Sequence, residues 1–507
     1  MKILAVDKIR EADLFTIQKE PIADIDLMER AANACFYWLI TNIPGHKKIK
    51  VICGAGNNGG DGFAIARLMA LKGYNTDVFL FGSPKKLSPN CRINFDRLSE
   101  STSIKCKVIA EKGSLPVFHH DEDIIIDALF GSGLSRPVTG FLAGVIRHIN
   151  DQHSITISID LPSGLFCDES VAGPPDPAII HADHTLTFSP PKLALFFPEN
   201  DRYVGNWHLL DIGILQEYID QAETHYYYTT RPDCKKILKK RNKFSHKGTF
   251  GHAFLVCGSK GKMGAAVLAA KACLRSGPGL VTAHIPRSGN TILQTAVPEA
   301  MLFLDADEDI FSGIPDLSGY SSIAIGPGIG QADATRRALK HLIQNSNLPL
   351  IFDADALNIL GESKTWISFI PKGSIFTPHP KEFERLVGKS SDDFERNKIQ
   401  REFSIKHGVY VVLKGAHTAI TTPDGNCYFN TTGNPGMATG GSGDVLTGIL
   451  AGIKAQGYSS LETCLLGVYI HGLAGDFAAE ERGHEALIAG DIIQHLGNAF
   501  LSLYGEF

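Results

Sequence analysis

The stretch Gly440-Gly441-Ser442-Gly443-Asp444 lies between a polar run, residues 430–439, and an apolar segment that we expect to begin a helix at Val445. Small residues let backbone N–H groups approach a ligand, and the start of a helix adds its dipole. The stretch is therefore typical of a phosphate site. Asp444 stands where a carboxylate would face the atom next to that phosphate, and we interpret it as a general base. The sequence thus predicts phosphoryl chemistry.

Short apolar runs that end in glycine or aspartate recur along the rest of the chain. Continuous apolar strands separated by helix-length segments indicate parallel sheets that are covered on both faces. In such sheets ligands bind beyond the carboxyl ends of the strands, where these glycines and aspartates lie. The runs are residues 50–54, 77–82, 124–127 and 156–160 in the first half, and 254–258, 323–326, 350–353 and 411–414 in the second.

A chain of 507 residues is too long for one ordinary domain. Residues 205–213 read as a last strand, and the polar, tyrosine-rich and basic segment 216–241 follows them. A glycine-marked turn at 245–251 then begins a new series of strands. Because the two halves do not repeat each other's motifs, we predict two different three-layer α/β domains, at 1–217 and 228–507.

Composition excludes several classes of protein. Hydrophobic residues at 44% and charged residues at 20% describe a globular protein with an ample core, and the formal charge of −5 comes without a long basic run, so no nucleic-acid partner is expected. The ten cysteines form no C-x-x-C pair, which favours reduced thiols over zinc ligands. No signal peptide and no apolar stretch of ~18 residues is recognised, so we expect a cytoplasmic protein without a membrane partner.

A second glycine-rich segment, Gly54-Ala-Gly-Asn-Asn-Gly-Gly-Asp-Gly62, predicts a second activity. It satisfies G-x-G-x-x-G after a strand, but the next strand begins with Asp77 and ends with Phe81-Gly82, so the acidic residue that would bind a ribose is absent from its end. A standard nicotinamide-dehydrogenase site is therefore not expected. Asn57, Asn58 and Asp61 supply side-chain oxygens instead.

Two further strand ends carry polar side chains. Asp127 precedes a glycine- and serine-rich loop, and Asp160 precedes Leu-Pro-Ser-Gly164. Asn58, Asp127 and Ser163 together offer hard oxygen ligands to a cation, and Asp160 is a candidate general acid/base. The alternative is that these aspartates cap helices and order turns.

The motifs Asn57-Asn-Gly-Gly-Asp-Gly62, Asp127-Ala-Leu-Phe-Gly-Ser-Gly133, Ser158-Ile-Asp-Leu-Pro-Ser-Gly164 and Pro191-Lys192 resemble the Rossmann-like epimerase domain of the NAD(P)H-hydrate repair enzymes. The resemblance covers about residues 1–215, with Ala194 as a departure where glycine is common. It implies interconversion of the R and S forms of hydrated NADH or NADPH (NADHX and NADPHX). It further implies a potassium ion held by Asn58, Asp127 and Ser163. Beside Asp160, the substrate site would include Asn57, Asn58, Gly59, Gly60, Asp61, Gly131, Ser132, Gly133, Leu134, Ser135, Arg136 and Pro137.

The second half resembles the dehydratase domain of the same family, which has a ribokinase-like fold. Lys381 and Pro278 depart from the usual pattern. In the family, Asp444 and the residues matching Ala265, Gly328 and His379 contact the hydrated cofactor. The nucleotide contacts are Lys414, Gly415, Ala416, His417, Thr418 and Gly443. The matching pieces are 258–265, 324–330, 353–358, 377–380 with Glu382, 414–418 and 434–444.

The chemistry of dehydration follows from these residues. Hydroxide is a poor leaving group, and phosphorylation of the hydroxyl supplies a better one. Asp444 would accept the hydroxyl proton, the N–H groups of Gly441–Gly443 would stabilise charge on the phosphate, and magnesium would bridge the nucleotide phosphates. Resemblance to the fused bacterial-type enzymes implies ADP as donor, giving AMP and phosphate, and no residue excludes ATP.

Several alternatives stay open. His379 lies between two prolines and fits a loop-ordering residue, and Asp355 fits a helix N-cap as well as a cleft residue. A ribokinase-superfamily small-molecule kinase with a non-catalytic, nucleotide-binding N-terminal module is the main rival function. The missing Asn-x-x-Glu motif after residue 230 argues against it. The resemblance also implies a homo-oligomer, while the preference for NADHX or NADPHX and the partner of Asp160 stay open.

Overall fold

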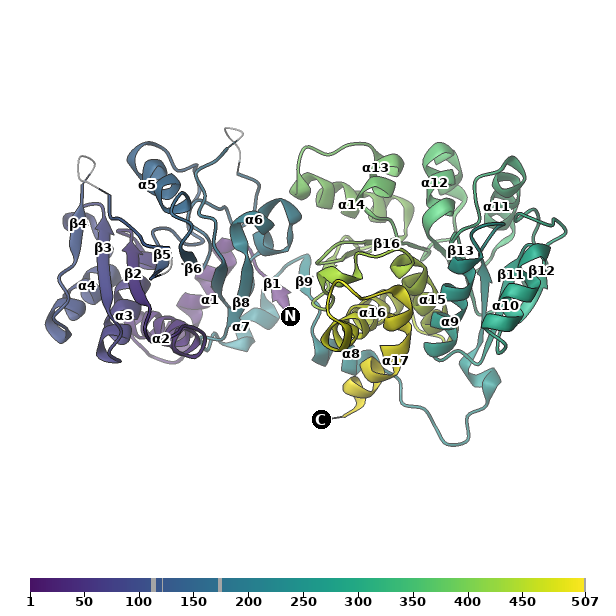
Figure 1. Ribbon diagram of the computed structural model, residues 1–507, viewed down its shortest axis with the longest axis horizontal. Helices are drawn as coiled ribbons and strands as arrows, with labels where there is room; N and C mark the ends of the chain where they lie inside the picture. Colours follow the sequence, from purple (N-terminus) through teal and green to yellow (C-terminus); the bar gives the residue numbers. More distant parts are fainter. Residues whose placement is uncertain (111–114, 121, 172–175, 506–507) are drawn as a thin grey trace. The chain divides into compact units, whose positions relative to one another are not determined.

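The computed structural model describes residues 1–110, 115–120, 122–171 and 176–505, which form two compact units (Figure 1). One consists of Lys2–Thr224 with Asp392–Phe394, and the other of Met1, His225–Ser391 and the chain from Glu395 onward. The predicted domain limits, 1–217 and 228–507, stay predictions.

The N-terminal unit contains a parallel sheet in the order β4-β3-β2-β5-β6-β7-β8. Its central strands β2 and β5 are buried on both faces, as the apolar runs within them predict. The strands are β2 (Lys48–Cys53), β3 (Thr76–Phe81), β4 (Lys107–Ile109), β5 (Asp123–Ala128), β6 (Ile155–Ile159), β7 (His184–Phe188) and β8 (Asn206–Leu210), and β1 (Lys2–Ile3) precedes the first helix.

Helices cover both faces of this sheet and make three layers. Alternate strand residues such as Val51 and Ile126 pack with α2 and α3, whereas Ile52 and Ile125 pack with α5. The helices are α1 (Val6–Lys19), α2 (Asp24–Asn42), α3 (Asn57–Leu71), α4 (Pro89–Ser101), α5 (Gly140–Asn150), α6 (Asp201–Val204) and α7 (Gln216–Gln221).

The C-terminal unit contains a larger sheet whose strands run in the order β9-β18-β17-β16-β15-β14-β13-β10-β11-β12. The sequence predicts a parallel sheet, but this sheet is mixed, because β17 is antiparallel to both of its neighbours. The strands are β9 (Tyr226–Tyr228), β10 (His252–Val256), β11 (Leu280–Ile285), β12 (Met301–Leu304), β13 (Ser322–Ile325), β14 (Leu350–Phe352), β15 (Ile375–Phe376), β16 (Tyr410–Leu413), β17 (Ala419–Thr421) and β18 (Cys427–Phe429).

This sheet also lies between two layers of helices, with α11 to α14 on one side and α9, α15 and α16 on the other (Figure 1). Ala253 and Leu255 of β10 belong to the core shared with α9 and α15. The helices are α8 (Arg231–Ile237), α9 (Met263–Arg275), α10 (Asn290–Ala296), α11 (Asp333–Asn345), α12 (Ala354–Glu362), α13 (Pro380–Val387), α14 (Asp393–His407), α15 (Ser442–Ala455), α16 (Ser460–Arg482) and α17 (Ala489–Tyr504).

The strands predicted from apolar runs are confirmed to within about two residues at their ends, which is the usual uncertainty of helix and strand limits. The helix expected from Val445 begins earlier, at Ser442, because Gly441 adopts a φ of +91° and turns the chain directly into the helix. Within the described part of the chain, no helix has the length and apolar character needed to cross a membrane.

Candidate active sites

At the carboxyl end of the N-terminal sheet, Asp127 organises a network of buried hydroxyls. Its Oδ2 accepts hydrogen bonds from Ser158 Oγ (2.8 Å) and Ser163 N (2.9 Å), and its Oδ1 accepts them from Ser163 Oγ (2.6 Å) and Leu129 N (3.2 Å). Burial raises the pKa of Asp127, although these hydrogen bonds act in the opposite direction. Two predicted cation ligands, Asp127 and Ser163, are thus joined directly.

The third predicted cation ligand, Asn58, lies in the first turn of α3. This turn can approach β2 closely because Gly59 has no side chain: a Cβ there would lie 1.9 Å from Gly54 O. Asn58 is 8% exposed, and neither atom of its carboxamide has a hydrogen-bond partner among the described residues. A buried amide of this kind is costly unless a ligand satisfies it. The carboxamide of Asn58 is therefore available to bind a ligand.

Asp160 follows β6 with a φ of +68°, an unusual conformation for a residue with a side chain. Its Oδ1 lies 2.8 Å from Lys192 Nζ, and its Oδ2 accepts a 2.8 Å hydrogen bond from Ser132 N. Burial raises the pKa of Asp160, but the Lys192 ammonium and the Ser132 N–H outweigh it and hold that pKa below its ordinary value. Lys192 also donates to Phe188 O at 2.7 Å. Asp160 is therefore a buried, ionised carboxylate.

The predicted substrate loop from Gly131 to Pro137 reaches this centre through its first residues. A Cβ on Gly131 would lie 2.9 Å from Asp160 Oδ2 and 3.3 Å from Asn58 Cγ, so the loop joins the predicted general acid/base to the predicted cation site. Ser132 contacts Asp160, whereas Ser135 and Arg136 are exposed. Of the first turn of α3, Asn57 accepts a 2.6 Å hydrogen bond from Ser88 Oγ.

Two more carboxyl groups belong to the same cluster. Burial, with Asp160 and Asp13 nearby, raises the pKa of Asp61 well above its ordinary value. Burial also raises the pKa of Asp13 on α1 to about 6, with Lys192 opposing and Asp160 adding to the shift. Sequence reasoning missed Asp13 and gave Lys192 no role. Asp13 follows no strand and no glycine-rich turn, so no local signal marks it.

In the C-terminal unit, Ser442, Gly443 and Asp444 form the first turn of α15. The first N–H groups of a helix have no partner within it and point toward any ligand at its start. Burial first, and then the neighbouring Asp353 and Asp355 carboxylates, raise the pKa of Asp444 to about 6, with Lys414 acting in the opposite direction. Asp444 therefore has the pKa of a general base that works near neutral pH.

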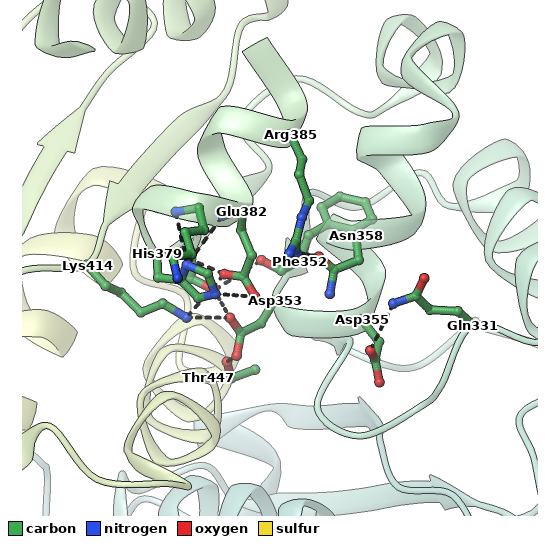
Figure 2. Close-up of polar contacts among 12 residues, drawn as sticks. Gln331, Phe352, Asp353, Asp355, Asn358, His379, Glu382, Arg385, Lys414 and Thr447 are labelled. Atoms are coloured by element: carbon green, nitrogen blue, oxygen red, sulfur yellow. Dashed lines mark hydrogen bonds and ion pairs between the residues drawn. The ribbon is translucent and has the colours of Figure 1, made fainter. Parts of the chain in front are cut away.

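Asp353 connects three strand ends with α15 (Figure 2). Its Oδ1 accepts hydrogen bonds from Lys414 Nζ at 2.9 Å and Thr377 Oγ1 at 2.8 Å, and its Oδ2 accepts one from Thr447 Oγ1 at 2.7 Å. The side chain is 1% exposed. Burial lowers the pKa of Lys414, but Asp353 and Glu382 outweigh it, so that pKa stays above its ordinary value. Lys414 is thus a fixed, charged group.

His379 orders the start of α13, which was the alternative role open to it. Its ring Nδ1 accepts hydrogen bonds from Lys381 N (3.1 Å) and Glu382 N (3.3 Å). The backbone N–H of His379 donates to Glu382 Oε2 at 2.9 Å. Glu382 Oε2 in turn lies 3.9 Å from Lys414 Nζ. His379 therefore lies beside the Asp353–Lys414 pair (Figure 2).

Ala265 and Gly328, both predicted to contact the hydrated cofactor, lie side by side. A Cβ on Gly328, whose φ is +64°, would lie 3.1 Å from Ala265 Cβ and 3.0 Å from Lys262 O. Asp355 does not cap α12, since the N-cap is Asp353. Its Oδ2 instead accepts hydrogen bonds from Gly330 N (2.9 Å) and Lys262 Nζ (3.2 Å), so it belongs to the wall of this site.

The predicted nucleotide segment, Lys414 to Thr418, forms a compact turn after β16. Thr418 Oγ1 donates to Gly415 O at 3.0 Å, and His417 Nδ1 lies 3.2 Å from Asn430 O. Lys414 and Gly443 meet across the site, because a Cβ on Gly443 would lie 3.4 Å from Lys414 Nζ. The turn and the start of α15 therefore face the same space.

Known proteins resemble both units. A protein-family model described as NAD(P)H-hydrate dehydratase matches residues 253–497. A second family model, described as the YjeF-related protein N-terminus, matches residues 24–194. The chain is 34% identical to the bifunctional NAD(P)H-hydrate repair enzyme Nnr of Moorella thermoacetica and 35% identical to that of Thermofilum pendens. Each alignment covers 100% of this chain and 98% of the relative.

Among solved structures, an ADP/ATP-dependent NAD(P)H-hydrate dehydratase from Bacillus subtilis, co-crystallised with ATP and Mg²⁺, is 30% identical with a TM-score of 0.48. The match covers 55% of this chain and 98% of that one.

The predicted α/β class, Rossmann-like in the first half and ribokinase-like in the second, is confirmed. A small-molecule kinase with an accessory module is not favoured, because the repair enzymes align with both units in a single chain. The chain belongs to the family of bifunctional NAD(P)H-hydrate repair enzymes.

Proposed function

We propose that the protein repairs hydrated NADH and NADPH through two activities on one chain. The C-terminal unit removes water from the S epimer at the expense of ADP, giving AMP and phosphate, and the N-terminal unit interconverts the R and S epimers. The observation that carries the proposal is Asp444 in the first turn of α15, with its pKa raised to about 6 and the Lys414 ammonium facing the same space.

Dehydration proceeds by phosphorylation and elimination. Asp444 takes the proton of the substrate hydroxyl. The hydroxyl oxygen attacks the terminal phosphorus of ADP, and AMP leaves. The N–H groups at the start of α15 and the Lys414 ammonium stabilise the charge on the phosphate during transfer. Phosphate then leaves with the C–O bonding electrons while the neighbouring carbon loses a proton, which restores the reduced nicotinamide ring.

Magnesium, when bound, neutralises negative charge on the nucleotide phosphates. Of the residues that the structure describes, no three His, Cys, Asp or Glu side chains gather as a metal site. That arrangement fits a magnesium ion that arrives on the phosphates and keeps its water ligands. ADP as the preferred donor stays part of the proposal.

Epimerisation needs one group that delivers a proton and another that removes one, since the hydroxyl must leave one face of its carbon and return on the other. Asp160 is the base, because Lys192 keeps it ionised. Asp13 is the acid, because burial keeps its proton up to about pH 6. Paired carboxyl groups whose pKa values are pushed apart are the usual basis for such a division of roles.

Potassium would bind at Asn58, Asp127 and Ser163. The buried, unpaired Asn58 Oδ1 supports this, since potassium binds neutral oxygen donors well. Asp127 already accepts hydrogen bonds from four donors, which fills its lone-pair positions. We therefore expect Asn58 to contact the ion directly, with Asp127 and Ser163 forming the polar wall behind it.

The test gives the purified chain a mixture of both NADPHX epimers with Mg²⁺, K⁺ and either ADP or ATP, and follows reduced-nicotinamide absorbance. Complete recovery of both epimers is expected, and the faster nucleotide identifies the donor. Recovery that stops when the S epimer is consumed would leave the N-terminal unit as a non-catalytic binding module. A cytoplasmic location and a homo-oligomer stay predictions.

A further inference from the structure

The two halves of the proposed phosphoryl-transfer centre meet at Asp353. Lys414 follows β16, and Thr447 lies one helical turn after Asp444 on α15. Both donate to the same carboxylate, at 2.9 Å and 2.7 Å (Figure 2). One buried side chain, 1% exposed, therefore holds both the Lys414 ammonium and the helix turn that carries Asp444.

We propose that Asp353 is a positioning residue for phosphoryl transfer: it holds the Lys414 ammonium beside the start of α15 and fixes the helix turn that carries Asp444. The inference rests on the proposed dehydration. It gives a role to a residue that the sequence marks only as the end of the apolar run 350–353.

The backbone around Asp353 is fixed independently of its side chain. Asp353 N donates to Ile325 O at 3.0 Å, and a Cβ on Gly326 would lie 1.8 Å from Asp353 O. The next residue, Ala354, has a φ of +46°, a conformation that residues with side chains rarely adopt. Backbone strain of this kind persists only where the surrounding structure imposes it, and it clusters at functional sites. The backbone thus fixes the direction in which the Asp353 side chain leaves the chain.

Charge gives Asp353 a second effect, on the strength of the base. The groups that act on Asp444 are the Asp353 and Asp355 carboxylates, which raise its pKa, and the Lys414 ammonium, which lowers it. Glu382 lies 3.9 Å from Lys414 on the far side of the pair, and Lys262 lies 3.2 Å from Asp355. Removing the Asp353 charge alone therefore makes Asp444 a stronger acid and a weaker base.

A purely structural role for Asp353 would change stability without changing the protonation of Asp444. The two roles are separated by Asp353→Asn, which keeps the shape of the side chain and removes its charge. We expect its kcat for dehydration of (S)-NADPHX to fall by about 10²-fold, the typical cost of misplacing a reacting group. The acidic limb of its pH–rate profile should move to lower pH, with a smaller change in KM for ADP.

Thr447→Val tests the positioning without the charge. It removes the 2.7 Å hydrogen bond but leaves the Asp353 carboxylate, so kcat should fall while the acidic limb stays in place. Thr447→Ser should restore kcat. Asp305→Asn is the matched control, since Asp305 is also 1% exposed but bonds His284 and Ser312 elsewhere in the unit. It should leave the acidic limb unchanged.

The inference would be overturned if Asp353→Asn and Thr447→Val both kept the wild-type kcat and the wild-type acidic limb of the pH–rate profile. If Asp353→Asn does not fold, judged by circular dichroism and by the unfolding transition of the C-terminal unit, the Thr447→Val and Thr447→Ser pair decides alone, and unchanged kcat in Thr447→Val overturns the inference. Failure of the proposed function gives a different result, because the wild-type chain itself would then fail to dehydrate (S)-NADPHX.

Discussion

Lys192 Nζ lies 2.8 Å from Asp160 Oδ1, and both side chains are buried at the carboxyl end of the N-terminal sheet. Breaking a buried pair by removing one partner leaves a charge without compensation and costs about 3–5 kcal/mol. We expect Lys192→Met to destabilise the N-terminal unit by this amount in urea unfolding at pH 7. The stabilisation of the ionised Asp160 is complete above the unfolded pKa of about 3.9, and it is lost as pH falls through the lower folded pKa.

Lys48→Met is the matched control for Lys192→Met. Lys48 Nζ also lies 2.8 Å from a carboxylate, that of Asp77, but the two side chains are 36% and 26% exposed. Exposed pairs contribute about 0–1 kcal/mol, so this variant should be close to wild type. Equal losses in the two variants would contradict the special role of burial.

The carboxylate of Asp444 should be required for dehydration and dispensable for epimerisation. Asp444→Asn keeps the shape of the side chain and removes the base, so dehydration should fall by about 10²–10⁴-fold. Because burial and Asp353 raise the pKa of Asp444 to about 6, the wild-type dehydration rate should rise with pH through about 6. The measurement is the pH profile of NADPH release from the S epimer. Near-normal turnover in Asp444→Asn would remove Asp444 as the base.

Asp160→Asn should show the reverse selectivity. Epimerisation should fall by about 10²–10⁴-fold, because the ionised oxygen that removes a proton is lost, while dehydration of the S epimer continues. The readout is the fraction of R epimer left after S has been consumed. An unchanged rate of R conversion would return Asp160 to a structural role as an ordered turn.

Asp13 should act as the proton donor in the same site. Its pKa of about 6 means that it loses its proton as pH rises above that value, so epimerisation should decline on the alkaline side. Asp13→Asn should lower the rate by about 10²-fold or more and remove that decline. Glu11→Gln is the control, since Glu11 lies on the same helix but is exposed. A rate that is flat from acid to neutral pH would exclude Asp13 as the acid.

Potassium should support epimerisation alone. Replacing it with a large organic cation should slow conversion of the R epimer, and Asn58→Ala should raise the potassium concentration needed for half-maximal rate. Dehydration by the same preparation serves as the control. An epimerisation rate indifferent to both changes would argue against a cation at Asn58.

The fold could be predicted because its signals are local. Buried parallel strands such as β5 and β13 contain short apolar runs, 124–126 and 323–325, and each run is followed directly by an aspartate or a glycine, Asp127 or Gly326. The antiparallel strand β17 was not predicted, because a strand of three residues is too short to show a hydrophobic period. The early start of α15 depends on the φ of Gly441, which composition alone does not reveal.

The candidate sites could be predicted only where their residues belong to motifs. Asp160 and Asp444 stand in short, distinctive stretches, whereas Asp13 lies on a helix whose sequence resembles any amphipathic helix. The role of Asp353 emerges only when three distant donors meet at its carboxylate. Contacts between residues far apart in sequence leave no local pattern, and they decide pKa values and orientation.

The residues assigned to each activity all come from one compact unit: Asp13, Asn58 and Asp160 from the first, and Asp353, Lys414 and Asp444 from the second. A chain disabled at Asp160 and a chain disabled at Asp444 should therefore complement each other in a mixed solution, because the freed epimer diffuses from one polypeptide to the next. Because both units lie on one chain, the two activities are always present in a one-to-one ratio.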